Sequence, residues 1–179
     1  MDDSEFEAFP ERIGALKHLR YLFSSSYAKI KRLPKSIFKL QNLQALAVTG
    51  EGLEELPKDV RYMISLRFLV LVSKQKRLPE GGIGCLECLQ TLLIFCCENL
   101  EDMQGLKSLR KLVIFYCDSL ISLPPNIKCL TTLEELFIMK CKKLNLMTIE
   151  EEKEGKIQPL SLSLRIVIFV GLPATLALP

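Results

Sequence analysis

One spacing of apolar residues returns along most of this 179-residue chain. It is clearest in the stretch 109–120, LRKLVIFYCDSL, which reads LxxLxIxxCxxL. The same spacing begins again at Leu89 and at Leu133. Apolar positions two residues apart are typical of a short strand with one buried face, so we expect Leu112 and Ile114 to point inward. A chain that repeats this unit must stack its strands side by side.

Looser copies of the unit come earlier in the chain. The residues that open them, Leu16, Leu40, Met63 and Leu86, lie 24, 23 and 23 residues apart. This period is that of a leucine-rich repeat, in which each unit buries its apolar face only against its neighbours. We therefore predict an α/β solenoid: a right-handed leucine-rich-repeat horseshoe with a parallel β-sheet on the concave side and an irregular or 3-10 convex side. About seven repeats would fill residues 13–179.

Two segments fall outside the regular period. Residues 1–12 have no periodicity and are expected to form a polar tail, and the charged segment near 145–159 is expected to be an exposed loop. Leu-Pro steps recur at Leu33-Pro34, Leu56-Pro57, Leu78-Pro79 and Leu123-Pro124. Because proline fixes φ and lacks a donor, these steps favour short 3-10 turns over long helices. The fourth repeat lacks the step and spans only 20 residues, from Leu86 to Leu106, which predicts a tighter outer segment.

Composition and charge limit the classes of partner. The chain is 49% hydrophobic and 25% charged, which is typical of a folded domain, and its net charge of +3 is too small to favour nucleic acid or an anionic membrane. No signal-peptide core and no apolar run of about 18 residues occurs. We expect a cytoplasmic protein that binds neither nucleic acid nor a membrane.

Cysteine usage indicates packing rather than disulfides or metal. The count of seven is odd, and three of the seven occupy one repeat position: Cys97, Cys117 and Cys141. These three should be buried, reduced thiols. Cys85 and Cys88 have metal-ligand spacing but no matching second pair, so Cys85 and Cys129 are interpreted as packing residues and no metal or cofactor is expected.

No catalytic constellation is recognisable. The single histidine, His18, has no nucleophile at a known spacing and is predicted to be a surface residue. The glycine-rich stretch 81–84 lacks the lysine and hydroxyl of a phosphate loop and is read as a turn. We predict that the protein is not an enzyme.

The residues most informative about function are the strand residues that point away from the core. One outward column is Phe23, Ala47, Val70, Leu93, Val113 and Phe137, and the other is Ser25, Thr49, Val72, Phe95, Phe115 and Met139. From these columns, with Tyr116 added, we select a candidate protein-binding surface on the concave face: Phe23, Val70, Leu93, Phe95, Val113, Phe115, Tyr116, Phe137 and Met139. The alternative is that β-propensity alone fills these positions and no partner is involved.

Three segments carry a family resemblance: IGALKHLRYL at 13–22, IKRLPKSI at 30–37 and LQNLQ at 40–44. They resemble the leucine-rich repeats of plant intracellular immune receptors, most closely those of the coiled-coil, nucleotide-binding type. Intracellular scaffolds of the Ras-binding leucine-rich-repeat kind share the Leu-Pro step, whereas the cysteine column favours the receptors.

The resemblance implies a function in plant defence. In that family the repeats sense a pathogen effector and restrain the nucleotide-binding module. It implies a protein partner: a pathogen effector, a guarded host protein or the nucleotide-binding domain of a receptor, with self-association possible. This chain has no phosphate loop, so ATP binding is not carried over, and a truncated receptor, a gene fragment and a small adaptor all fit. A constitutive intracellular scaffold with no immune role is the alternative function.

Overall fold

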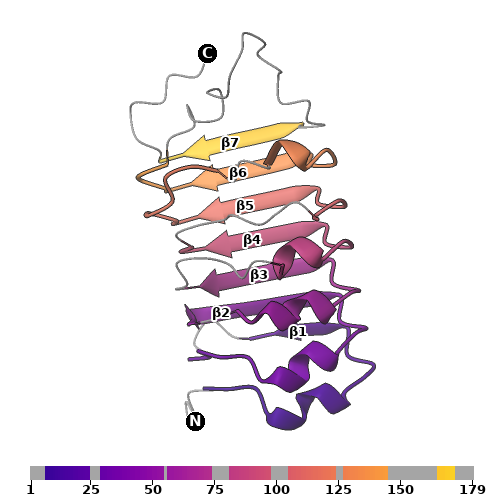
Figure 1. Ribbon diagram of the computed structural model, residues 1–179. Helices are drawn as coiled ribbons and strands as arrows, with labels where there is room; N and C mark the ends of the chain where they lie inside the picture. Colours follow the sequence, from indigo (N-terminus) through magenta and orange to yellow (C-terminus); the bar gives the residue numbers. More distant parts are fainter. Residues whose placement is uncertain are drawn as a thin grey trace.

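A computed structural model of the protein describes residues 7–24, 29–54, 56–73, 81–97, 105–123, 127–144 and 165–171. Within these residues seven strands form one open parallel sheet, and each strand pairs only with its neighbours in sequence (Figure 1). The strands are β1 (Tyr21–Phe23), β2 (Ala45–Leu53), β3 (Phe68–Ser73), β4 (Thr91–Phe95), β5 (Lys111–Phe115), β6 (Glu135–Met139) and β7 (Ile166–Val170). The prediction of a parallel solenoid with one short strand per repeat is confirmed.

The helical elements of the described residues are all short 3-10 turns. They are η1 (Glu11–Ala15), η2 (Lys35–Lys39), η3 (Lys58–Tyr62), η4 (Ile83–Cys85) and η5 (Ile127–Cys129). Proline directly precedes the first three, with φ near −65°, and its carbonyl accepts the first 3-10 hydrogen bond, as from Ile37 N to Pro34 O at 3.0 Å. Pro79 and Pro124 lie outside the described residues. No helix in this part of the chain is long and apolar enough to cross a membrane.

The strand register agrees with the sequence pattern. Leu112 pairs with Leu92 and Leu136, Ile114 pairs with Ile94 and Ile138, and all of these point into one continuous core. The pairing of β6 with β7 fixes the register of the last repeat. Val167 pairs with Leu136 and Phe169 pairs with Ile138, so Val167 and Phe169 take the inward positions.

The two ends of the stack differ from its middle. Phe9 is only 7% exposed and belongs to the core, and η1 begins at Glu11, so the stack starts earlier than Ile13 and the described part of residues 1–12 is not a free tail. Leu16, expected at a repeat position, is 55% exposed. At the other end Val167 is 43% exposed, against 4% for its partner Leu136, and within the described residues β7 pairs with β6 alone. The predicted loop at 145–159 lies outside the described residues.

One contact sets the distance between the fourth and fifth coils. A Cβ atom on Gly105 would lie 1.7 Å from the carbonyl oxygen of Gly84. Backbone therefore meets backbone at this point, and only glycine fits at position 105.

Candidate protein-binding surface

The outward side of the sheet carries three columns of side chains, which together we call the strand face. The first column is Tyr21, Ala45, Phe68, Thr91, Lys111, Glu135 and Ile166. The second is Phe23, Ala47, Val70, Leu93, Val113, Phe137 and Ile168, and the third is Val72, Phe95, Phe115, Met139 and Val170. The second and third contain the columns identified from the sequence, except that Ser25 lies outside the described residues and Thr49 does not pair with Val72 in the register of β2 and β3. The first was missed, although the two-residue alternation of each strand defines it equally well.

The residues of the candidate surface all lie on the strand face, except Tyr116, which directly follows β5. Phe23 is 59% exposed, and Leu93, Phe95, Phe115, Phe137 and Met139 are half-buried. Val70 and Val113 are only 8% exposed, yet neither belongs to the core on the other side of the sheet. The larger side chains of the strand face therefore cover these two valines, which support the surface from below rather than present it.

An aromatic cluster occupies the end of the strand face where β4 and β5 finish. The rings of Phe95 and Phe115 are 5.6 Å apart, and the Tyr116 ring lies edge-on to Phe115 at 4.4 Å. Consecutive strand residues point to opposite faces. Tyr116 follows Phe115 directly, yet its ring lies on the same side as that of Phe115. The reason is that φ of Tyr116 is +54°, in the left-handed region, which turns the ring back against Phe115.

The left-handed turn is repeated in the neighbouring coils. Cys96, Tyr116 and Lys140 have φ of 61°, 54° and 55°, and Gly171 holds the equivalent position after β7 with φ of 64°. At Cys96, Tyr116 and Lys140 the N–H bonds to the next strand, as Tyr116 N does to Met139 O at 3.1 Å. The only sequence signal for this turn is Gly171, because the other three residues rarely adopt such a conformation.

Two lysines lie over aromatic rings of the strand face. Lys140 Nζ donates a hydrogen bond to Tyr116 Oη at 2.7 Å and lies 4.8 Å from the centre of that ring. Lys111 Nζ is 4.7 Å from the centre of the Phe137 ring and 2.7 Å from Glu135 Oε2. Sequence reasoning missed these charged groups. The strand face therefore carries charged as well as apolar groups, and cation–π contacts hold the two ammonium groups in place.

An exposed ion pair links the turns that follow β5 and β6. Lys142 Nζ donates to Asp118 Oδ2 at 2.7 Å, and this hydrogen bond lowers the pKa of Asp118 and raises that of Lys142. Both groups are on the surface, so the pair contributes little to stability.

The cysteines divide into a buried and an exposed set. Cys97, Cys117 and Cys141 are fully buried and free, as predicted from the repeat column. A hydrogen bond with the Cys141 thiol, followed by burial, raises the pKa of Cys117 well above the ordinary thiol range. The prediction for Cys85 and Cys129 is wrong, because both are exposed: they precede the buried leucine at the end of a 3-10 turn and point outward.

The described residues offer no catalytic arrangement. No group of three or more His, Cys, Asp or Glu side chains in them could hold a metal ion. His18 is exposed, as predicted, and Gly81 forms a turn with φ of 67°.

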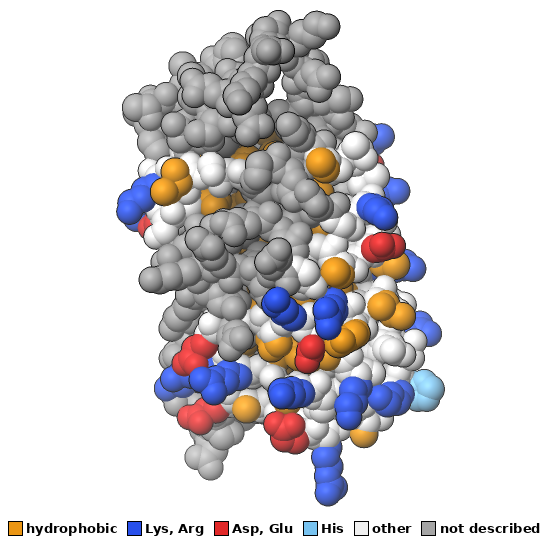
Figure 2. All heavy atoms as spheres, in the orientation of Figure 1, with side chains coloured by type: hydrophobic (Ala, Val, Ile, Leu, Met, Phe, Trp, Pro, Cys, Tyr) orange, Lys and Arg blue, Asp and Glu red, His pale blue; other side chains and the backbone are white. Residues whose placement is uncertain are grey.

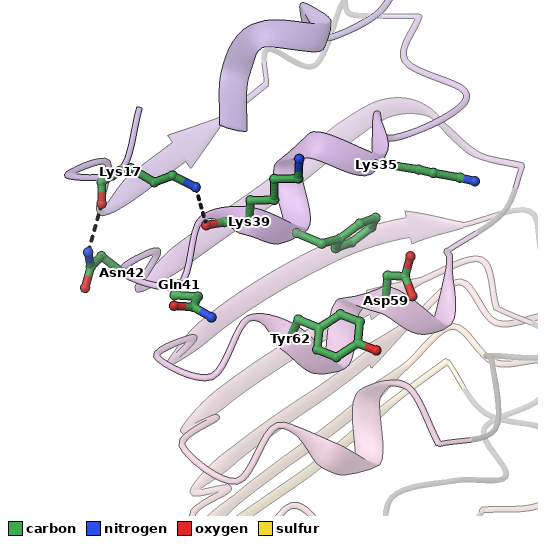
Figure 3. A pocket seen from close by; sticks show the side chains of 8 residues that line it. Lys17, Lys35, Lys39, Gln41, Asn42, Asp59 and Tyr62 are labelled. Atoms are coloured by element: carbon green, nitrogen blue, oxygen red, sulfur yellow. Dashed lines mark hydrogen bonds between the residues drawn. The ribbon is translucent and has the colours of Figure 1, made fainter. Parts of the chain in front are cut away.

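A hollow of about 610 Å³ lies on the side of the 3-10 turns (Figure 3). Its walls include Lys17, Lys39, Phe38 and Tyr62. Lys17 Nζ donates to the Lys39 carbonyl at 3.3 Å, and the other ammonium groups point in different directions in Figure 3. The charges do not converge, so the hollow defines no single ligand position.

Comparison with known proteins identifies the family. The family described as "Leucine-rich repeat region" matches residues 7–175, and this chain belongs to it. Domains of this family are protein-interaction modules. The leucine-rich repeat domain of the type III effector XopL has the same fold, with a TM-score of 0.66 and 21% identity over 92% of this chain and 66% of that one.

The curated relatives are longer proteins. "Probable disease resistance protein RF45" and "Probable disease resistance protein RDL5" of Arabidopsis thaliana are each 37% identical over 131 residues, which is 70% of this chain and 13% of theirs. The mouse (Mus musculus) "Volume-regulated anion channel subunit LRRC8B" is 31% identical over 137 residues, 70% of this chain and 16% of that protein. This chain thus corresponds to a small part of each relative.

Proposed function

We propose that this chain is a non-catalytic protein-recognition module of the plant defence response that works in the cytoplasm through its strand face. The binding residues are Phe23, Leu93, Phe95, Phe115, Tyr116, Phe137 and Met139, supported by Val70 and Val113. The partner is a pathogen effector, a guarded host protein or the nucleotide-binding domain of a receptor. Similarity to the two Arabidopsis proteins supports the defence assignment.

The observation that carries the proposal is the partly exposed aromatic cluster at the ends of β4 and β5. Aromatic residues are enriched where proteins bind one another, because they bury a large area at a small cost in conformational entropy. Phe95, Phe115 and Tyr116 already contact each other and are held by the strand register and the left-handed turn. A preorganised surface loses little entropy on binding.

A second candidate function is a constitutive intracellular scaffold with no immune role. The mouse channel subunit supports it, because repeats of this kind also occur in proteins that are not named for disease resistance. Both functions would use the strand face, so the identity of the bound protein distinguishes them and the location of the binding surface does not.

The experiment compares three tagged forms of the full chain in leaves, with and without pathogen challenge. They are the wild type, the strand-face variant Phe115→Ser/Phe137→Ser, and the control Ile64→Ser/Ile121→Ser. Ile64 and Ile121 are 58% and 66% exposed and lie outside the strands. The control therefore removes exposed apolar surface elsewhere on the same protein.

The defence assignment predicts that the wild type and the control capture a resistance protein or a pathogen protein and change pathogen growth, and that the strand-face variant does neither. Capture of the same host proteins in challenged and unchallenged leaves, with no change in growth, would favour the scaffold. Equal capture by all three forms would refute the strand face as the binding surface.

A further inference from the structure

The edge at which the chain enters the strands carries a second, unassigned pattern. The residue directly before each strand is arginine in the first, third, fifth and seventh coils: Arg20, Arg67, Arg110 and Arg165. The coils between them have Gln44, Gln90 and Glu134 at this position. We call this column the arginine edge. Figure 2 shows basic side chains following one another along this edge of the molecule, at the right of the view.

Backbone hydrogen bonds hold the arginine edge in register. The carbonyl of each of these residues before Arg165 accepts two N–H groups from the next coil, as Arg67 O does from Gln90 N at 2.8 Å and Thr91 N at 2.9 Å. The same pair of hydrogen bonds repeats at every step from Arg20 to Arg165, with N···O distances of 2.7 to 3.1 Å. The side chains therefore follow the spacing of the strands and do not depend on a loop conformation.

That spacing defines a period for the charges. Adjacent strands lie about 4.8 Å apart, so arginines in alternate coils recur about every 9.6 Å. All four are exposed, and Arg110 makes one long contact with a carboxylate, 3.9 Å from Glu134 Oε1. The four guanidinium groups together cover about 29 Å.

A hollow of about 270 Å³ lies at the first-coil end of this edge. His18, Arg20, Asn42, Gln44 and Ser65 line it. All five carry hydrogen-bonding side chains, and His18 and Arg20 are exposed. The hollow can accept a carboxylate at one end of a longer ligand, because Arg20 offers a planar pair of donors.

We propose that the arginine edge binds an extended acidic segment of a partner protein, in the polyproline II conformation, with a carboxylate at every third residue. The polyproline II helix has three residues per turn and rises 3.1 Å per residue, so every third side chain points the same way at about 9.3 Å. This matches the arginine period. A β-strand does not match it, because its same-face side chains recur at about 6.7 Å.

Single-stranded nucleic acid is disfavoured at this edge. Successive phosphates of a single strand are closer together than successive arginines of this edge. Proteins that bind single strands also supply aromatic side chains on which the bases stack, whereas the residues of this column are arginine, glutamine and glutamate. The inference does not depend on the strand face. Phe115→Ser/Phe137→Ser should leave binding at the arginine edge unchanged, so the two proposals can fail separately.

The test uses a fluorescent peptide of four Glu-Pro-Pro units, whose glutamates span about 28 Å. Its control is an isomer of the same composition with the four glutamates clustered at one end. Fluorescence anisotropy with the full chain at low salt should give affinity about tenfold higher for the periodic peptide. Equal affinity for the two isomers would overturn the proposal, because charge alone would then explain binding.

Protein variants locate the site. Arg20→Gln/Arg67→Gln gives those positions the residue that the second and fourth coils already have, and should weaken binding about tenfold. Lys35→Gln/Lys39→Gln makes the same change in net charge on η2 and should have less than a twofold effect. Circular dichroism checks that each variant is folded. Equal weakening by the two pairs, or tighter binding of an oligothymidine than of the periodic peptide, would contradict the assignment.

Discussion

The close contact between the fourth and fifth coils at Gly105 gives a prediction about stability. Replacing Gly105 with alanine places a Cβ 1.7 Å from the Gly84 carbonyl oxygen, whereas an ordinary carbon–oxygen contact is about 3.3 Å or longer. The fourth and fifth coils must therefore separate by about 1.6 Å at this point, which loosens the packing of the leucines on either side. We expect Gly105→Ala to lower the free energy of unfolding by about 3 kcal/mol, the cost of an overpacked core.

The matched control is Gly81→Ala. A Cβ at position 81 meets nothing within 4 Å, but φ there is +67°, so only left-handed strain of about 1 kcal/mol is added. Both changes alter the unfolded chain equally. For a chain of this size the thermal midpoint should fall by about 6–12 °C in Gly105→Ala and about 2–4 °C in Gly81→Ala. The midpoints are measured by circular dichroism. An equal decrease in Gly105→Ala and Gly81→Ala would refute the close approach of the two backbones at Gly105.

Further predictions concern the core, the thiols and the left-handed turn. Ile114→Ala should lower the free energy of unfolding by about 3 kcal/mol in chemical denaturation, whereas Phe115→Ala should cost about 1 kcal/mol, because Ile114 is fully buried and Phe115 is half-exposed. An alkylating reagent followed by mass spectrometry should modify Cys85, Cys88, Cys96 and Cys129 in the folded chain, and Cys97, Cys117 and Cys141 only after unfolding. Because the folded pKa of Cys117 is raised, its contribution to stability is complete below the ordinary thiol pKa and should be lost as pH rises above it, which a series of denaturation curves at alkaline pH would show. Cys96→Gly should raise the free energy of unfolding by about 0.5–1 kcal/mol and so raise the thermal midpoint slightly. A lowered midpoint would contradict the strain assigned to φ of 61°.

The sequence was sufficient for the sheet because two periods coincide in it. The two-residue alternation orients Leu112 and Ile114 inward, and the longer repeat places Leu136 and Ile138 beside them. A shift by one residue would expose every one of these side chains, so the register is strongly determined. The buried thiols followed from the same argument, since Cys117 and Cys141 occupy one position in adjacent coils.

The surface was less accessible to sequence reasoning, because it depends on distances between coils. Nothing in the sequence indicates that Tyr116 adopts a left-handed conformation and packs on Phe115, or that Val113 is covered by its neighbours. The exposure of Cys85 was mispredicted because its position before a buried leucine resembles a packing position. The alternation of Arg67 with Gln90 is visible in the sequence, but its period has meaning only once the coils are stacked at a known spacing.

The central claim is that Phe115 and Phe137 belong to a binding surface and not to the core. Far-UV circular dichroism of Phe115→Ser/Phe137→Ser beside Ile114→Ser/Ile138→Ser tests it most directly, together with capture of the leaf partner by the folded forms. Each phenylalanine should contribute about 1–2 kcal/mol to association, less than for a fully exposed ring, because both are already half-buried. We predict that the phenylalanine variant keeps its sheet signal and loses its partner, and that the isoleucine variant loses its sheet signal. A phenylalanine variant that unfolds, or one that binds as tightly as the wild type, would contradict this account.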